Sequence, residues 1–147
     1  MKTVLLIHGP NLNMLGKRDS HQYGTLTLRE LTQKVKIAAK KLGLTVKAFQ
    51  SNHEGDLIDY LQKEAPHADG IIVNAGALTH YSYALHDALL DTRLPAIEVH
   101  LSDVKSREAW RRNSVIAPAC LRVISGKKYG GYREAIELLA ILLKKKV

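Results

Sequence analysis

The sequence predicts a three-layer α/β fold around a five-stranded parallel sheet. Five short apolar runs rich in Val and Ile recur along the chain, and such near-continuous runs are typical of parallel strands covered on both faces. Stretches with apolar residues at helical spacing alternate with them. A length of 147 residues suits one compact domain, so we expect residues 1–147 to form a single catalytic or binding unit.

The elements can be placed in order along the chain. Strands are expected at Val4–Ile7, Val46–Phe49, Ile71–Val73, Ala96–Val99 and Leu121–Ile124. The first helix is predicted from apolar residues at helical spacing and ends near Gly43. These residues are Leu28, Leu31, Val35, Ala38, Ala39 and Leu42. Further helices are expected after Ser51 and over Tyr83–Leu90, Arg107–Arg112 and Tyr132–Leu143. This alternation favours a flavodoxin-like sandwich.

Two helix starts carry the sequence pattern of a capping box. Thr27 is followed three residues later by Glu30, and Ser51 by Glu54. In such a box the hydroxyl and the carboxylate each accept a backbone N–H at the start of the helix. Both sites are therefore predicted to begin helices.

The charge balance points to an anionic partner. The formal net charge is +8, from 22 Lys and Arg against 14 Asp and Glu. The lysines are dispersed along expected helices, and aromatic residues make up only 5% of the chain without a stacking motif. We therefore expect no nucleic-acid partner and favour a small anion, although a basic module that binds nucleotides or nucleic acid remains the non-enzyme alternative.

The first apolar run and the cysteine usage bear on location. Thr3–Ile7 is too short for a membrane span or a secretory signal. The single Cys120 has no partner for an intramolecular disulfide, which suits a reducing compartment. We expect a cytoplasmic protein that does not bind membranes.

Polar residues gather where the expected strands end. They include His8 to Asn13, Gln50 to His53, Asn74 to His80 and His100 to Asp103. Because ligands of open α/β sheets bind outside the carboxyl ends of the strands, these loops should form the site.

Several common ligands of this fold do not suit these loops. Gly9 and Gly16 are too far apart for a phosphate-binding or dinucleotide fingerprint. His53, His80 and His100 show no metal-ligand spacing, so we expect no metal site. A flavin enzyme remains an alternative, although no aromatic pair is evident that would sandwich the flavin ring.

The segment from Gly16 to Gly24 is a polar, glycine-bounded loop of the lid type. Arg18 and Tyr23 within it are either a surface arginine and an anchoring tyrosine, or a base and its activator. Ionising a tyrosine near neutral pH requires roughly 4 kcal/mol. One guanidinium about 4 Å away supplies about that much.

Glu98 and His100 lie two residues apart on an expected strand and hence share one face. They either tie the strand end together or form a general acid, His100, oriented by Glu98. His80 and Asp87 are expected on one face of the third helix, as a functional or a structural pair. Arg107, Arg111 and Arg112 crowd a short segment, where one arginine aimed at the strand edge would bind a carboxylate.

These motifs together resemble the type II 3-dehydroquinate dehydratases. The resemblance covers essentially the whole chain and rests on Gly9–Gly16 with Arg18 and Tyr23–Gly24, Phe49–Asn52 with Glu54–Gly55 and Leu57–Asp59, Ile72–Ala77 with Thr79–His80, Glu98–Ser102 with Arg107–Glu108 and Arg111, and Gly130–Tyr132. It implies a hydro-lyase of the shikimate pathway of aromatic amino acid biosynthesis. This enzyme eliminates water from 3-dehydroquinate through an enolate, without metal or cofactor, to give 3-dehydroshikimate.

The resemblance also implies a role for each site residue. Tyr23 would remove the C2 proton with the help of Arg18, and Asn11 would hold a water that stabilises the enolate. His100, backed by Glu98, would protonate the departing hydroxyl. The substrate would be held by Asn74, His80, Leu101, Ser102 and Arg111, with Asp87 reaching in from a neighbouring subunit. The resemblance further implies a homododecamer built as a tetramer of trimers.

Some positions depart from the family pattern. Ala75 stands where the family usually has proline, Asp19-Ser20 replaces the commoner Glu-Pro, and Asp103 replaces asparagine. Arg112 and Asn113 also differ from a stretch that usually contains histidine. None of these changes removes a proposed catalytic group, so we expect them to act on loop and lid behaviour.

Overall fold

A computed structural model describes residues 1–144 and contains the predicted parallel sheet. The strands are β1 (Lys2–His8), β2 (Leu44–Gln50), β3 (Gly70–Asn74), β4 (Ala96–His100) and β5 (Arg122–Ser125). All of them pair in parallel, in the order β2-β1-β3-β4-β5. This arrangement confirms the flavodoxin-like fold class.

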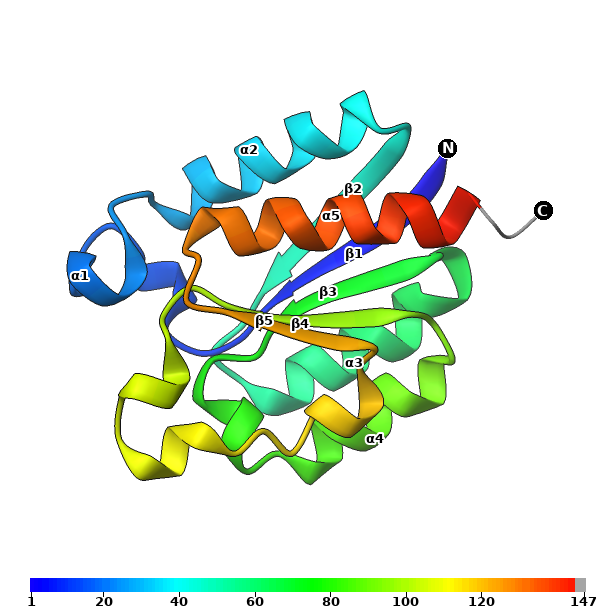
Figure 1. The fold of residues 1–147 in the computed structure, drawn as a ribbon. Coiled ribbons are helices and arrows are strands. Elements are labelled where there is room, and N and C mark those ends of the chain that lie inside the picture. The colour runs from blue at the N-terminus through cyan, green and yellow to red at the C-terminus, as the bar shows by residue number, and fades with distance from the viewer. Residues whose placement is uncertain (145–147) are drawn as a thin grey trace.

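Helices cover both faces of the sheet (Figure 1). One face carries α2 (Leu28–Lys41) and α5 (Tyr129–Lys144), and the other carries α3 (Glu54–Glu64) and α4 (Tyr83–Thr92). The short helix α1 (Ser20–Tyr23) lies beyond the carboxyl ends of the strands. Single-turn 3₁₀ helices occupy Leu12–Met14, Ala65–His67, Gly76–His80, Val104–Ser106, Ala109–Arg112 and Ala117–Ala119.

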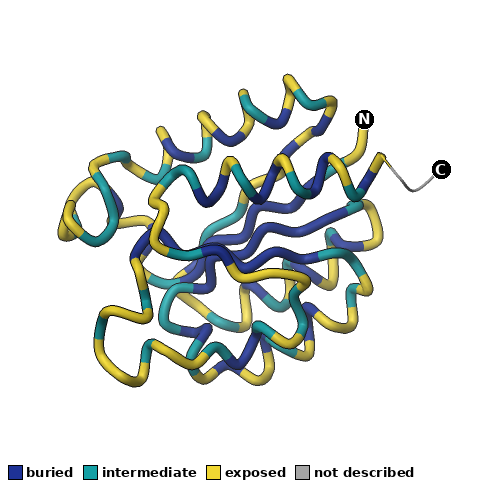
Figure 2. Tube along the Cα trace, viewed as in Figure 1, coloured by how far each residue is buried: buried dark blue, intermediate teal, exposed yellow. Residues whose placement is uncertain are grey.

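The two helical layers bury two separate apolar clusters. Successive side chains of β1 point to opposite faces, so Val4 and Leu6 join the cluster under α2 and α5, while Leu5 and Ile7 join the cluster on the α3–α4 side. Figure 2 shows the strands buried between helices that are exposed on their outer sides. This double burial explains why the strands read as continuous apolar runs.

One predicted capping box is confirmed and the other is wrong. Thr27 and Glu30 exchange the two expected bonds at 3.0 and 3.1 Å. At the second site His53, not Ser51, is the N-cap of α3. Ser51 still pairs with the sheet through its N–H to the His8 carbonyl, and its hydroxyl donates to Asp56 at 2.7 Å.

Three other expectations about the elements need correction. Arg107–Arg112 is not one helix, because Arg107 has an extended backbone between two 3₁₀ turns. His80 and Asp87 are not on one helix, since Tyr81 and Ser82 separate the 3₁₀ turn of His80 from α4. The fifth strand begins at Arg122 rather than at Leu121, whose side chain is exposed. No helix within residues 1–144 is long and apolar enough to cross a membrane.

Candidate active site

The carboxyl ends of β1, β3 and β4 meet at one edge, where the loops after them enclose a pocket. Figure 1 shows α1 and the segment after β4 at this same end of the sheet. Nine of the residues predicted for the site line the pocket, and they are Asn11, Arg18, Tyr23, Asn74, His80, His100, Leu101, Ser102 and Arg111. The topology therefore brings together residues that are far apart in the sequence.

Tyr23 lies between two arginines that contact different parts of its ring. The Arg18 guanidinium lies over the ring face, with its Cζ atom 3.7 Å from the centroid. The Tyr23 hydroxyl instead accepts a hydrogen bond from Arg107 at 2.7 Å. Arg107 also donates to the Ser102 hydroxyl at 3.2 Å. Each guanidinium therefore places a positive charge beside the phenol, and Arg107 does so through a direct bond to the oxygen.

The sequence alone suggested Arg107 only as one of three candidates for binding a carboxylate, and it did not predict the bond to Tyr23. Arg107 is one of three arginines in a short segment. What distinguishes it from the other two is its hydrogen bond to Tyr23, which lies 84 positions earlier in the chain. The exposed Arg112 does not line the pocket. No spacing rule connects Arg107 with Tyr23, and the only available signal was its place in the family motif.

Local structure fixes the position of Tyr23. Asp19 is the N-cap of α1, and its carboxylate accepts the backbone N–H of His21 at 3.0 Å. Tyr23 is the last residue of this single turn, which ends at Gly24 with φ 79°. Since few other residues adopt that backbone conformation, the glycine allows the chain to turn away directly after Tyr23.

His100 is held by a carboxylate from behind. Its Nε2 atom lies 2.5 Å from Glu98 Oε2, and both residues are buried. Because Nε2 faces Glu98, Nδ1 is the nitrogen left for the pocket. The expected pairing of the two side chains on one face of β4 is therefore present.

Glu98 receives further hydrogen bonds from Thr79 at 2.6 Å and from Ser114 at 2.8 and 2.9 Å. Burial alone would raise the pKa of the Glu98 carboxyl, but these bonds and the neighbouring His100 hold its pKa below the ordinary value. Glu98 is therefore a buried carboxylate that lies directly behind His100.

Asn11 and Asn74 are positioned by a close approach of two loops. Gly9 donates its N–H to the Asn74 carbonyl at 2.8 Å. A Cβ atom on Gly9 would lie 2.3 Å from the Ala75 carbonyl oxygen, so a side chain is excluded there. Asn52 accepts the Asn11 N–H at 3.0 Å, which ties the loop after β2 to the same site.

His80 and Asp87 have different surroundings. His80 Nδ1 lies 2.8 Å from the Asn113 carbonyl oxygen, and its ring meets Trp110 edge to face. Burial is the main cause that lowers the pKa of His80. Asp87 lies on α4 with its side chain 74% exposed and does not line this chain's pocket.

Arg111 completes the basic side of the pocket. Its Nε atom donates to Glu108 at 3.0 Å, and its guanidinium lies over the Trp110 ring. Together with Arg18 and Arg107 it makes the pocket attractive to an anion. Within residues 1–144 no group of three or more His, Cys, Asp or Glu side chains is placed to hold a metal ion.

Comparisons with known proteins identify the family. Residues 2–140 match the family described as "Dehydroquinase class II". The chain is 54% identical over 136 residues to a 3-dehydroquinate dehydratase of Roseiflexus castenholzii, covering 92% of this chain and 87% of that protein. It is 45% identical to a catabolic 3-dehydroquinase of Aspergillus clavatus, covering 99% and 97%.

A solved structure shares the fold as well. The type II dehydroquinase from Butyrivibrio crossotus superposes with a TM-score of 0.91 at 42% identity, covering 94% of this chain and 97% of that one. The family match, the relatives and the solved structure lead to one conclusion: the chain belongs to the class II dehydroquinase family.

Proposed function

We propose that this protein converts 3-dehydroquinate to 3-dehydroshikimate by a stepwise elimination of water through an enolate. The observation that carries the proposal is the pocket itself. An arginine-bonded Tyr23 and a carboxylate-backed His100 line the same small basic cavity. One side chain is suited to take a proton and the other to deliver one.

In the first step the Tyr23 phenolate takes the proton from C2, next to the ketone. The electron pair of that bond moves onto the ketone oxygen and forms the enolate. Asn11, with a bound water, stabilises the developing charge. Arg107 and Arg18 favour the phenolate form of Tyr23 that begins this step.

In the second step the enolate collapses and the C1–O bond breaks. His100 gives its proton from Nδ1 to the departing hydroxyl, so water leaves and a C1–C2 double bond remains. Glu98 supports the protonated imidazole through Nε2. Asn74, His80, Ser102, Arg111 and the Leu101 backbone bind the hydroxyl groups and the carboxylate.

We infer that the site is completed by a second copy of the chain, within a dodecamer of four trimers. Asp87 is exposed on α4 and does not line the pocket of its own chain. Its proposed role in substrate binding therefore requires the pocket of a neighbouring subunit. Mixing inactive Asp87→Ala and Tyr23→Phe proteins, after dissociation and reassembly, should restore activity, because some sites then combine an intact Tyr23 with a neighbour's Asp87. No recovery in mixed assemblies would contradict this placement.

We propose that the protein is located in the cytoplasm. Cys120 is the single cysteine of the sequence, so no intramolecular disulfide can form. Burial raises the pKa of its thiol to about 12, and both features suit a reducing compartment. Expression of the native gene followed by cell fractionation tests this expectation.

The proposed reaction is tested with 3-dehydroquinate and purified protein. The ultraviolet absorbance of the conjugated product should rise, and it should do so equally after treatment with a chelator or borohydride. The reason is that acid, base and enolate stabilisers are all side chains, and the described lining of the pocket contains no lysine that would form a Schiff base. Absence of turnover would reject the proposed function.

A further inference from the structure

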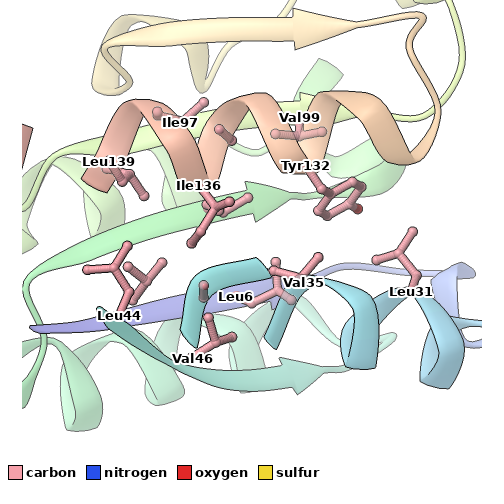
Figure 3. Packing of buried hydrophobic residues seen from close by; sticks show 14 of the residues in the cluster. Leu6, Leu31, Val35, Leu44, Val46, Ile97, Val99, Tyr132, Ile136 and Leu139 are labelled. Carbon is pink, nitrogen blue, oxygen red and sulfur yellow. The ribbon is translucent and has the colours of Figure 1, made fainter. Parts of the chain in front are cut away.

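Behind the pocket, three polar side chains from three elements form a buried chain of hydrogen bonds. His8 ends β1, Asn74 ends β3, and Tyr132 lies on the first turns of α5. Their exposed fractions are 1%, 3% and 0%. Figure 3 shows the Tyr132 ring reaching from α5 toward the strands within the apolar cluster. Only Asn74 of the three lines the pocket.

The orientation of the Asn74 amide follows from its neighbours. The Gly76 backbone N–H donates to one side-chain atom of Asn74 at 3.1 Å, and a backbone N–H cannot accept. That atom is therefore the oxygen, Oδ1. The nitrogen, Nδ2, must then face Tyr132, to whose hydroxyl oxygen it donates at 2.9 Å.

The direction of the next bond is fixed in the same way. Among the described residues the buried Tyr132 hydroxyl has two hydrogen-bond partners, Asn74 Nδ2 and His8 Nε2. The amide nitrogen cannot accept, so the hydroxyl proton goes to His8 Nε2, 3.0 Å away. His8 must then be neutral, with its hydrogen on Nδ1. Burial lowers the pKa of His8 to about 3, which agrees with a neutral ring at physiological pH.

We propose that His8 and Tyr132 are positioning residues that lock the Asn74 amide in one orientation for substrate binding. Each end of the amide has one bond to the protein, so one N–H and one lone pair remain for the pocket. Without Tyr132 the amide would keep only the Gly76 bond and would rotate more freely. This inference rests on the proposed function, because Asn74 acts there on the substrate.

A purely structural role makes a different prediction. Losing the Tyr132 hydroxyl would leave the buried Asn74 amide and His8 Nε2 without this partner, so stability would fall in either case. Only the positioning role predicts a kinetic effect that is transmitted through Asn74. Tyr129→Phe is the matched control, because this tyrosine lies one turn earlier on the same helix and donates to the Lys34 carbonyl outside the pocket.

The test is a double-mutant cycle on dehydration of 3-dehydroquinate. Tyr132→Phe should lower kcat/KM about tenfold, the effect expected for losing one hydrogen bond of about 1.4 kcal/mol. In an Asn74→Ala background the same change should have no further effect. Tyr129→Phe should leave kcat/KM unchanged. The inference would be overturned if Tyr132→Phe still caused a tenfold loss in the Asn74→Ala background. It would also be overturned if the wild-type protein were active and Tyr132→Phe caused no loss of kcat/KM.

His8 gives an independent route to the same answer if Tyr132→Phe fails to fold. His8→Gln places an amide oxygen where Nε2 accepts the Tyr132 proton, so kcat/KM should stay within about twofold of wild type. His8→Leu removes the acceptor and should behave like Tyr132→Phe. Equal kcat/KM for the two variants would reject a positioning role for the hydrogen bonds that join His8, Tyr132 and Asn74. An inactive wild-type protein would instead reject the proposed function.

Discussion

At the scale of single residues, Tyr23 is shared between two guanidinium groups. Arg18 contacts its ring face, while Arg107 bonds its oxygen. A hydrogen bond to the oxygen stabilises the phenolate more directly than a cation over the ring, because the negative charge develops on that atom. In the proposed mechanism Arg107 therefore joins Arg18 in activating Tyr23.

Arg107→Ala should lower kcat/KM by about 100-fold or more, the usual effect of removing one donor from a developing anion. Arg112→Ala is the control, because this nearby arginine is exposed and outside the pocket. It should change kcat/KM by less than about twofold. If Arg107→Ala kept nearly full activity while Arg18→Ala lost it, the arginine over the ring would be the sole activator.

At the scale of elements, the strands and most helices are predictable because burial imposes their pattern. β1, β3 and β4 are continuous apolar runs, and the Thr27 capping box marks the start of α2. The second capping box failed because Ser51 remains bonded to the edge of the sheet. The helix α3 still begins at Glu54. Ser51 is held by the His8 carbonyl and by Asp56 and does not act as the N-cap of this helix.

The partners of each site residue were harder to predict than the residues themselves. Glu98 and His100 were paired correctly because their spacing on one strand fixes their common face. Other contacts join distant parts of the chain. They are the bond from Arg107 to Tyr23 and the hydrogen bonds through which Tyr132 connects His8 with Asn74. Local periodicity carries no information on such contacts.

The loops after β1 and β3 depend on a glycine for their close approach. Gly9→Ala should lower the free energy of unfolding by about 1–3 kcal/mol, because its Cβ would overlap the Ala75 carbonyl. Activity should fall too, since the loops carry Asn11 and Asn74. Gly55→Ala in α3 is the control: it meets no atom within 4 Å and should stabilise by up to about 1 kcal/mol. Chemical denaturation measures both, and equal effects would contradict the account.

At the scale of the whole molecule, the buried His8 links stability to pH. Its pKa is lowered by burial from 6.5 to about 3. The unfolded chain therefore takes up this proton first as the pH falls, so the folded state loses stability between about pH 6.5 and pH 3. The loss reaches at most about 5 kcal/mol, at about 1.4 kcal/mol per pH unit.

His8→Gln should reduce the dependence of the unfolding free energy on pH between about 6.5 and 5, above the range where carboxylates titrate. His67→Gln, at an exposed position, should keep the wild-type slope. Denaturant titrations at several pH values measure these slopes. Identical slopes in both variants would show that His8 is not the buried titrating group.

The central claim is that Tyr23 and His100 divide one elimination into two proton transfers. It is tested most directly by measuring, in deuterated water, both hydrogen exchange at C2 of 3-dehydroquinate and formation of the conjugated product. Tyr23→Phe should lose both processes. Glu98→Gln removes the charge that supports protonated His100 but leaves the base intact, so it should lose dehydration much more than exchange. Equal loss of the two processes in Glu98→Gln, or continued turnover by Tyr23→Phe, would contradict the account.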